Sequence, residues 1–157
     1  MIIKGLIDED FVNYKKPSMV IEMPYCTFKC DKECGRQVCQ NSALARAENI
    51  SIENIKLLER YFNNPITKAV IFQGLEPFDS WEELYEFIYA FRMRVNDDII
   101  IYTGYNEEEI SEYINILHNF SNIIVKFGRF IPNSLHKFDN ILGVELASDN
   151  QYAERIS

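Results

Sequence analysis

The sequence predicts an α/β fold built on a mostly parallel sheet. Runs of apolar, largely β-branched residues are the expected strands, at 19–23, 68–73, 98–103 and 122–127. Between them lie segments whose apolar residues recur at helical spacing, at 52–62, 81–95 and 107–117. Alternation of strand and helix makes parallel strand pairs joined by crossovers. With 157 residues and no low-complexity linker, the chain is expected to form one domain over 1–157.

In the N-terminal half, residues 1–17 carry scattered apolar side chains and are expected to add a short edge element. The strand at 19–23 is stopped by Pro24. Residues 42–47 favour a short helix. Ser51 is the expected cap of the next helix, which Asn63, Asn64 and Pro65 end.

In the C-terminal half, Ser80 and Glu83 have the spacing of a capping box ahead of the helix at 81–95. Asn106 is the expected cap of the following helix, whose first turn is acidic and so complements the helix dipole. Residues 131–140 are expected to form an irregular loop. A last strand is predicted at 141–146, before a polar tail.

All four cysteines lie within one segment, the cysteine loop (25–41), at positions 26, 30, 34 and 39. A disulfide framework usually scatters cysteines along the chain, whereas a metal or cluster site gathers them. The chain shows no apolar signal region and no apolar run long enough to span a bilayer, so a cytoplasmic, thiol-reducing location is expected. Clustered thiols in that setting indicate metal binding or redox chemistry.

The spacing of the thiols leaves the kind of metal site open. Three, three and four residues separate successive cysteines, and no Cys-x-x-Cys pair occurs. Structural zinc sites usually present two tight pairs, and a loop around an iron-sulfur cluster suits the observed gaps at least as well. Zinc and cluster both remain open on spacing alone.

The net charge of −8 argues against nonspecific binding to nucleic acid or to an anionic membrane surface. A macromolecular partner is therefore expected to be a protein. The two histidines, His118 and His136, lie beside no recognisable partner group, so neither is a candidate catalytic residue.

With these residues in view, the chain resembles the radical S-adenosylmethionine (SAM) enzymes, and among them the activating proteins of anaerobic ribonucleoside-triphosphate reductase. The Cys-x-x-x-Cys half of that family's motif is matched at 26–30, and its final Cys with the following Asn at 39–41, with an insertion between them. Residues 74–77 (Gly-Leu-Glu-Pro) look like the family's Gly-Gly-Glu-Pro. Segments 101–105, 128–130 and 146–151 are also similar to the activating proteins.

The resemblance implies a partial (β/α) barrel of the radical SAM type and two cofactors, a [4Fe-4S] cluster and SAM. The implied cluster ligands are Cys26, Cys30 and Cys39, which leave one iron open for SAM, and Cys34 is the alternative ligand. The positions implied for binding SAM are Asn41, Gly74, Leu75, Glu76, Pro77 and Thr103. No catalytic residue is implied beyond the cluster.

The activity implied by the resemblance is reductive cleavage of SAM to a 5'-deoxyadenosyl radical, which installs a glycyl radical on an anaerobic ribonucleotide reductase. The implied partners are that glycyl-radical enzyme and, as electron donor, reduced flavodoxin or ferredoxin. Three alternatives stay open: a radical SAM enzyme acting on a small molecule or peptide, a non-enzymatic zinc-binding protein, and a degenerate family member that binds the cluster but cannot cleave SAM.

Overall fold

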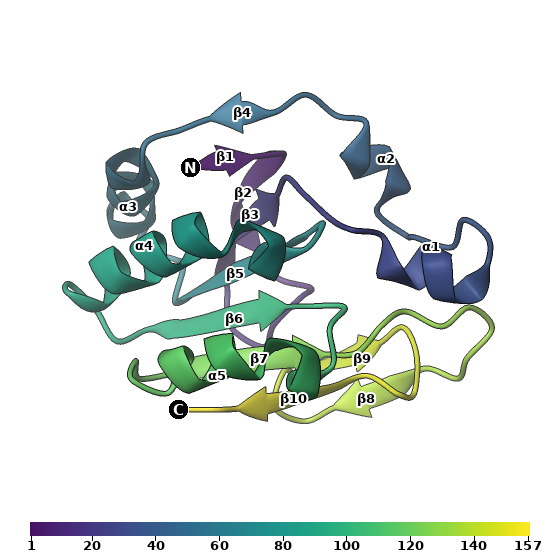
Figure 1. Ribbon diagram of the computed structural model, residues 1–157. Coiled ribbons are helices and arrows are strands. Elements are labelled where there is room, and N and C mark those ends of the chain that lie inside the picture. The colour runs from purple at the N-terminus through teal and green to yellow at the C-terminus, as the bar shows by residue number, and fades with distance from the viewer.

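A six-stranded sheet forms the centre of the protein, for which the computed structural model describes residues 1–157 (Figure 1). Its strands lie in the order β10-β7-β6-β5-β3-β2. The four inner strands are parallel, and the two edge strands pair antiparallel with their neighbours. The strands are β2 (Gly5–Asp10), β3 (Ser18–Met23), β5 (Ala69–Gly74), β6 (Asp98–Tyr102), β7 (Ile123–Phe127) and β10 (Tyr152–Arg155).

Three helices connect the parallel strands: α3 (Asn54–Asn63), α4 (Trp81–Arg92) and α5 (Ser111–Leu117). Short 3₁₀ turns, η1 (Pro77–Ser80) and η2 (Glu107–Ile110), precede α4 and α5. Two short helices, α1 (Lys29–Cys34) and α2 (Ser42–Ala45), lie beyond the end to which the arrow of β6 points (Figure 1). No helix has the length and apolar character needed to cross a membrane.

Two small antiparallel pairs complete the fold. One joins β1 (Ile2–Ile3) to β4 (Ile50–Ser51), and the other joins β8 (Lys137–Asp139) to β9 (Val144–Leu146).

The inner strands are mostly apolar because both faces of the sheet are covered. Alternate residues point to opposite faces. One face packs against α3, α4 and α5 in the larger core, with side chains such as Phe72, Phe87 and Leu57 fully buried. The opposite face forms a smaller core, in which Val20, Ile71, Ile100 and Ile124 are covered by Tyr14, Leu142 and Leu146.

The four predicted strands between residues 19 and 127 are confirmed to within a residue or two. The predicted edge element is confirmed as β2. No barrel is identified, because the sheet is open between its edges β2 and β10. The mostly parallel sheet is therefore confirmed, and the barrel type stays a prediction.

Four local expectations were wrong. Ser51 lies in β4, and Glu53 precedes α3 instead. Ser80 makes no capping bond, because the carboxylate of Glu83 accepts from the backbone N–H of Ile2. The loop 131–140 contains β8, and the polar tail contains β10. In three of these cases a partner distant in sequence supplied the contact that decided the local structure, whereas β8 pairs with the neighbouring β9.

A buried carboxylate links three segments of the chain at the amino end of β6. Asp98, at the start of β6, accepts hydrogen bonds from Lys16 at 2.5 Å, Tyr14 at 3.0 Å and Arg155 at 3.0 Å. Burial opposes ionisation of this carboxyl, but the three donors outweigh it and hold the pKa below the ordinary value of 3.8. Asp98 thereby links the 10–17 segment, β6 and β10.

We expect Asp98→Asn to lower the free energy of unfolding at pH 7 by about 1–3 kcal/mol, because it weakens three hydrogen bonds to a buried acceptor. Since the folded pKa is depressed, the contribution of Asp98 is complete above the unfolded pKa and is lost as the pH falls through the folded pKa. Urea unfolding at pH 7 and at pH 3 should therefore show a larger difference between wild type and variant at pH 7 than at pH 3. An equal difference at both values would contradict this account.

Candidate functional site

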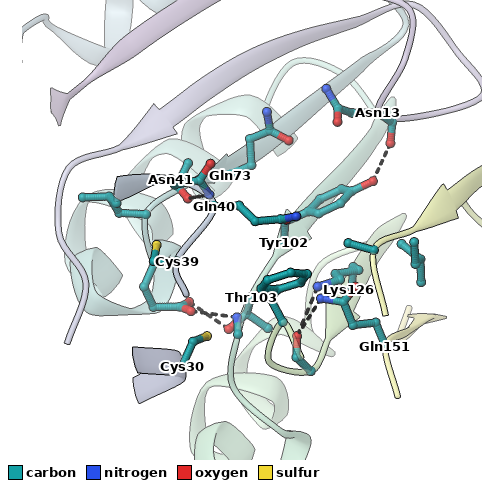
Figure 2. Close-up of a pocket in the computed structure, with 18 of the residues that line it drawn as sticks. Asn13, Cys30, Cys39, Gln40, Asn41, Gln73, Tyr102, Thr103, Lys126 and Gln151 are labelled. Atoms are coloured by element: carbon teal, nitrogen blue, oxygen red, sulfur yellow. Dashed lines mark hydrogen bonds between the residues drawn. The ribbon is translucent and has the colours of Figure 1, made fainter. Parts of the chain in front are cut away.

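One cavity lies at the carboxyl ends of the parallel strands, with a volume of about 360 Å³ (Figure 2). Its walls come from the segments that follow β3, β5, β6 and β7, which the sequence predicted to share one edge of the sheet. That prediction is confirmed. The carboxyl ends of parallel strands are where α/β proteins place ligands.

Three of the four thiols face this cavity. Cys26, Cys30 and Cys39 are half-buried and line it, while Cys34 is exposed and does not. Figure 2 shows Cys30 and Cys39 on the same side of the cavity. Of the two triplets that spacing alone left open, only the one with Cys39 lines this cavity with all three thiols, and the choice of cluster ligands stays a prediction.

The sequence of the loop explains this separation. Phe28 adopts a left-handed φ of 54° and donates its N–H to the sulfur of Cys26 at 3.2 Å, after which α1 begins. Gly35 ends α1 with a left-handed φ of 66°, a conformation that glycine accepts readily. The chain then folds back. Because α1 points Cys34 outward and Gly35 reverses the chain, the last cysteine returns to the cavity.

Asp31 fixes the returning segment. Its Oδ1 accepts the backbone N–H of Val38 at 2.7 Å and that of Cys39 at 2.8 Å. The first turn of α1 is thus bonded directly to the residue that carries the third thiol.

Charged side chains anchor the outer face of α1. Glu109 accepts from Lys29 at 3.0 Å and from Arg129 at 2.6 Å. The hydrogen bond from Arg129 is the main reason that the pKa of Glu109 lies at about 2. The Nε of Arg129 also lies 2.9 Å from Glu33, although the two groups are not aligned for a hydrogen bond. These contacts hold the helix of the cysteine loop against the turns after β6 and β7.

Glu76 is the buried carboxylate of the cavity. It accepts from the hydroxyl of Thr103 at 2.8 Å and from the backbone N–H groups of Gly104 at 2.9 Å and Phe78 at 3.2 Å. Burial raises its pKa to about 7, against the lowering effect of these donors. Thr103 therefore orients Glu76 as well as lining the cavity.

The other predicted SAM positions occupy different places. Gly74 and Leu75 line the cavity, as does Asn41, whose side chain donates to the carbonyl of Gly74 at 2.5 Å. Gly74 has a φ of 93°, and an added Cβ would lie 2.9 Å from Leu44, so glycine is required where α2 approaches. Pro77 is buried at the start of η1 and does not line the cavity.

The sequence reasoning missed a row of polar side chains on the floor of the cavity: Glu22, Gln73, Tyr102 and Lys126. Each is the last residue of its strand to point to the smaller-core face, two positions after a buried Val or Ile. The signal was present, because a polar residue stands at or next to the carboxyl end of each of these strands. Burial lowers the pKa of Lys126 to about 8.

The donor set of the cavity fits a cluster. Burial raises the pKa of Cys26 to about 11 and also raises that of Cys30, and the charge of Cys39 adds to both shifts. Thiolates gathered in this way repel one another unless a cationic centre lies between them. No three His, Cys, Asp or Glu side chains are grouped as one metal ion would require. A four-iron cluster gives each thiolate its own iron, so its ligands need not meet at one point.

Three thiols face one cavity at the ends of the parallel strands. The class of protein that fits this site is an iron-sulfur protein. Comparison with family models supports the class: the 4Fe-4S single cluster domain matches residues 18–151. The chain therefore belongs to the 4Fe-4S single cluster domain family. No curated protein and no solved structure matched the chain in the comparisons made.

We expect Asp31→Ala to weaken retention of the cluster by about tenfold or more, because the N–H groups of Val38 and Cys39 lose their acceptor. The measurement is the rate at which a chelator removes iron from the anaerobically reconstituted protein. Lys32→Ala, an exposed neighbour on α1, is the matched control and should behave as wild type. Equal rates in all three proteins would show that Asp31 does not hold the loop.

Proposed function

We propose that the chain is a radical SAM enzyme, in which a [4Fe-4S] cluster held by Cys26, Cys30 and Cys39 reductively cleaves SAM to methionine and a 5'-deoxyadenosyl radical that abstracts hydrogen from a substrate. The observation that carries this proposal is the shared cavity of these three thiols and the segment 74–76. Three ligands on four irons leave one iron for an exchangeable ligand.

The residues around the cavity suit the amino-acid end of SAM. Glu76 Oε2 accepts one hydrogen bond from the chain, so it retains capacity for a second one from an ammonium group. Asn41 donates to the backbone carbonyl of Gly74, and Thr103 donates to the carboxylate of Glu76. Gly74 has no side chain to fill the space between Glu22 and Leu44. These groups would bind and orient SAM.

The substrate we propose is a glycine of an anaerobic ribonucleotide reductase, converted to a glycyl radical, with reduced flavodoxin or ferredoxin as electron donor. Two facts support a protein substrate. The resemblance to the activating proteins extends from the cysteine loop to residues 146–151. The cavity of about 360 Å³ has little room for a whole second molecule beside SAM, so most of the substrate would remain outside.

We expect Cys26→Ala, Cys30→Ala and Cys39→Ala each to lose cluster iron and the release of 5'-deoxyadenosine under dithionite, since each removes one of three ligands. Cys34→Ala should retain both, because Cys34 is exposed and outside the cavity. Iron content and 5'-deoxyadenosine are measured after anaerobic reconstitution with SAM.

The other outcomes separate the alternatives. Loss in Cys34→Ala with retention in Cys39→Ala would overturn the ligand assignment alone. Stoichiometric zinc without iron would overturn the cluster. A brown wild-type protein that never releases 5'-deoxyadenosine would overturn the radical SAM activity while leaving the family membership standing.

The partner is tested separately. Mixing the reconstituted protein, SAM and reductant with an anaerobic ribonucleotide reductase should produce the electron paramagnetic resonance signal of a glycyl radical, and Cys39→Ala should produce none. Steady release of 5'-deoxyadenosine without that signal would reject this substrate but not the cleavage of SAM.

A further inference from the structure

The polar row on the cavity floor crosses four neighbouring strands in one register. Glu22 of β3 pairs with Gln73 of β5, and Tyr102 of β6 pairs with Lys126 of β7. The two pairs are continuous, because Phe72, just before Gln73, pairs with Ile101, just before Tyr102. Neighbouring strands lie about 4.8 Å apart, so the row spans on the order of 14 Å.

The middle of the row is a fixed surface. The hydroxyl of Tyr102 donates to the carbonyl of Asn13 at 2.6 Å, which leaves the ring as part of the floor. The side chain of Gln73 has no hydrogen-bond partner within the protein, although it lines the cavity. Figure 2 shows Cys30 and Cys39 on one side of the cavity and Lys126 and Gln151 on the other.

Lys126 is the unusual member of the row. It is 7% exposed, yet no carboxylate lies within ion-pair distance of it. Its ammonium makes one hydrogen bond, to the carbonyl of Gly128 at 3.2 Å, and lies 5.9 Å from the centre of the Tyr102 ring. An ammonium has three donors, and lysine is almost never fully buried without a partner. At least one donor position of Lys126 is therefore left for a ligand.

No other group of the chain is placed to satisfy this charge. Glu76, the buried carboxylate of the cavity, is already bonded to Thr103, Gly104 and Phe78. Glu22 lies at the opposite end of the row, three strands away.

We propose that the floor formed by Gln73, Tyr102 and Lys126 binds the second reactant of this enzyme, and that Lys126 binds an anionic group of that reactant, a carboxylate or a phosphate. The inference rests on the proposed function, because it assumes that SAM occupies the thiol side of the cavity. It adds the substrate class: the reactant carries an anion close to the atom that loses hydrogen.

Position assigns this floor to the second reactant and not to the amino-acid end of SAM. The thiols and Glu76 belong to loops beyond the strand ends, whereas Lys126 and Gln73 lie within the strands and below that level. A molecule seated on the floor would therefore lie beneath SAM and across the cavity from the thiols.

The test compares two blocked dipeptides that differ in charge and hardly in shape, N-acetylglycyl-aspartate N-methylamide and its asparagine counterpart. Their dissociation constants are measured by ligand-observed nuclear magnetic resonance on the cluster-loaded protein with SAM. We expect wild type to prefer the acidic peptide by about tenfold and Lys126→Met to lose this preference. Lys68→Met, at the amino end of β5 and exposed, is the control and should keep it.

Binding of inorganic phosphate is measured as a second experiment. It distinguishes a small phosphorylated reactant from an acidic polypeptide segment. Binding of phosphate that Lys126→Met abolishes, with no preference between the peptides, supports the anion site and assigns it to a small molecule. Absence of both effects in wild type overturns the proposal. So does a preference for the acidic peptide that survives in Lys126→Met.

A stability measurement guards against a merely misfolded variant. Because Lys126 is a buried charge without a counter-ion, Lys126→Met should melt at the same temperature as wild type or higher in the absence of ligand. A markedly lower melting temperature would instead assign Lys126 a structural role and overturn the proposal.

The dissociation constant of SAM and its cleavage are measured in the same proteins. Normal SAM cleavage without any anion preference defeats this inference alone. Failure of wild type to cleave SAM defeats the proposed function, whatever the peptides show.

Discussion

The common register of β3, β5, β6 and β7 is the constraint on which the rest of the structure depends. Because these strands are parallel and end together, the segments that follow them meet along one edge of the sheet. The same register places Glu22, Gln73, Tyr102 and Lys126 side by side on the floor of the cavity. A shift of one strand by a single residue would turn its polar side chain toward the helices and an apolar one toward the cavity.

The strands were predictable because their signal is local and strong. A buried parallel strand is covered on both faces, so β5, β6 and β7 each contain a run of consecutive apolar, mostly β-branched residues. Most of the failures depend on contacts between residues that are distant in sequence. Glu83 is diverted from its cap by the N-terminal strand, and the polar residues of β10 become a strand only because β7 offers an edge. Neither partner can be read from the local sequence.

The candidate site, like the fold, could be predicted from the sequence only in part. The gathering of the cysteines and the Gly-Leu-Glu-Pro segment were visible as motifs, but spacing could not choose between Cys34 and Cys39. Which of these two thiols faces the cavity depends on the direction of α1, the reversal at Gly35 and the bonds from Asp31. Pro77 belongs to the motif and yet lies outside the cavity, since it serves the turn into α4. The polar row could not be predicted from the sequence, because its four residues become neighbours only when the strands are placed in register.

The two faces of the sheet are covered by different kinds of structure. The helices that connect the strands cover one face, while the 10–17 segment and the chain beyond residue 139 cover the other, above the cavity. The segments that cover the cavity on this face lie near the two ends of the chain. Mutations in them change the cavity and leave unchanged the helical layer, which supplies most of the buried apolar contact. Such a division lets evolution alter what the cavity admits without disturbing the scaffold of this iron-sulfur protein.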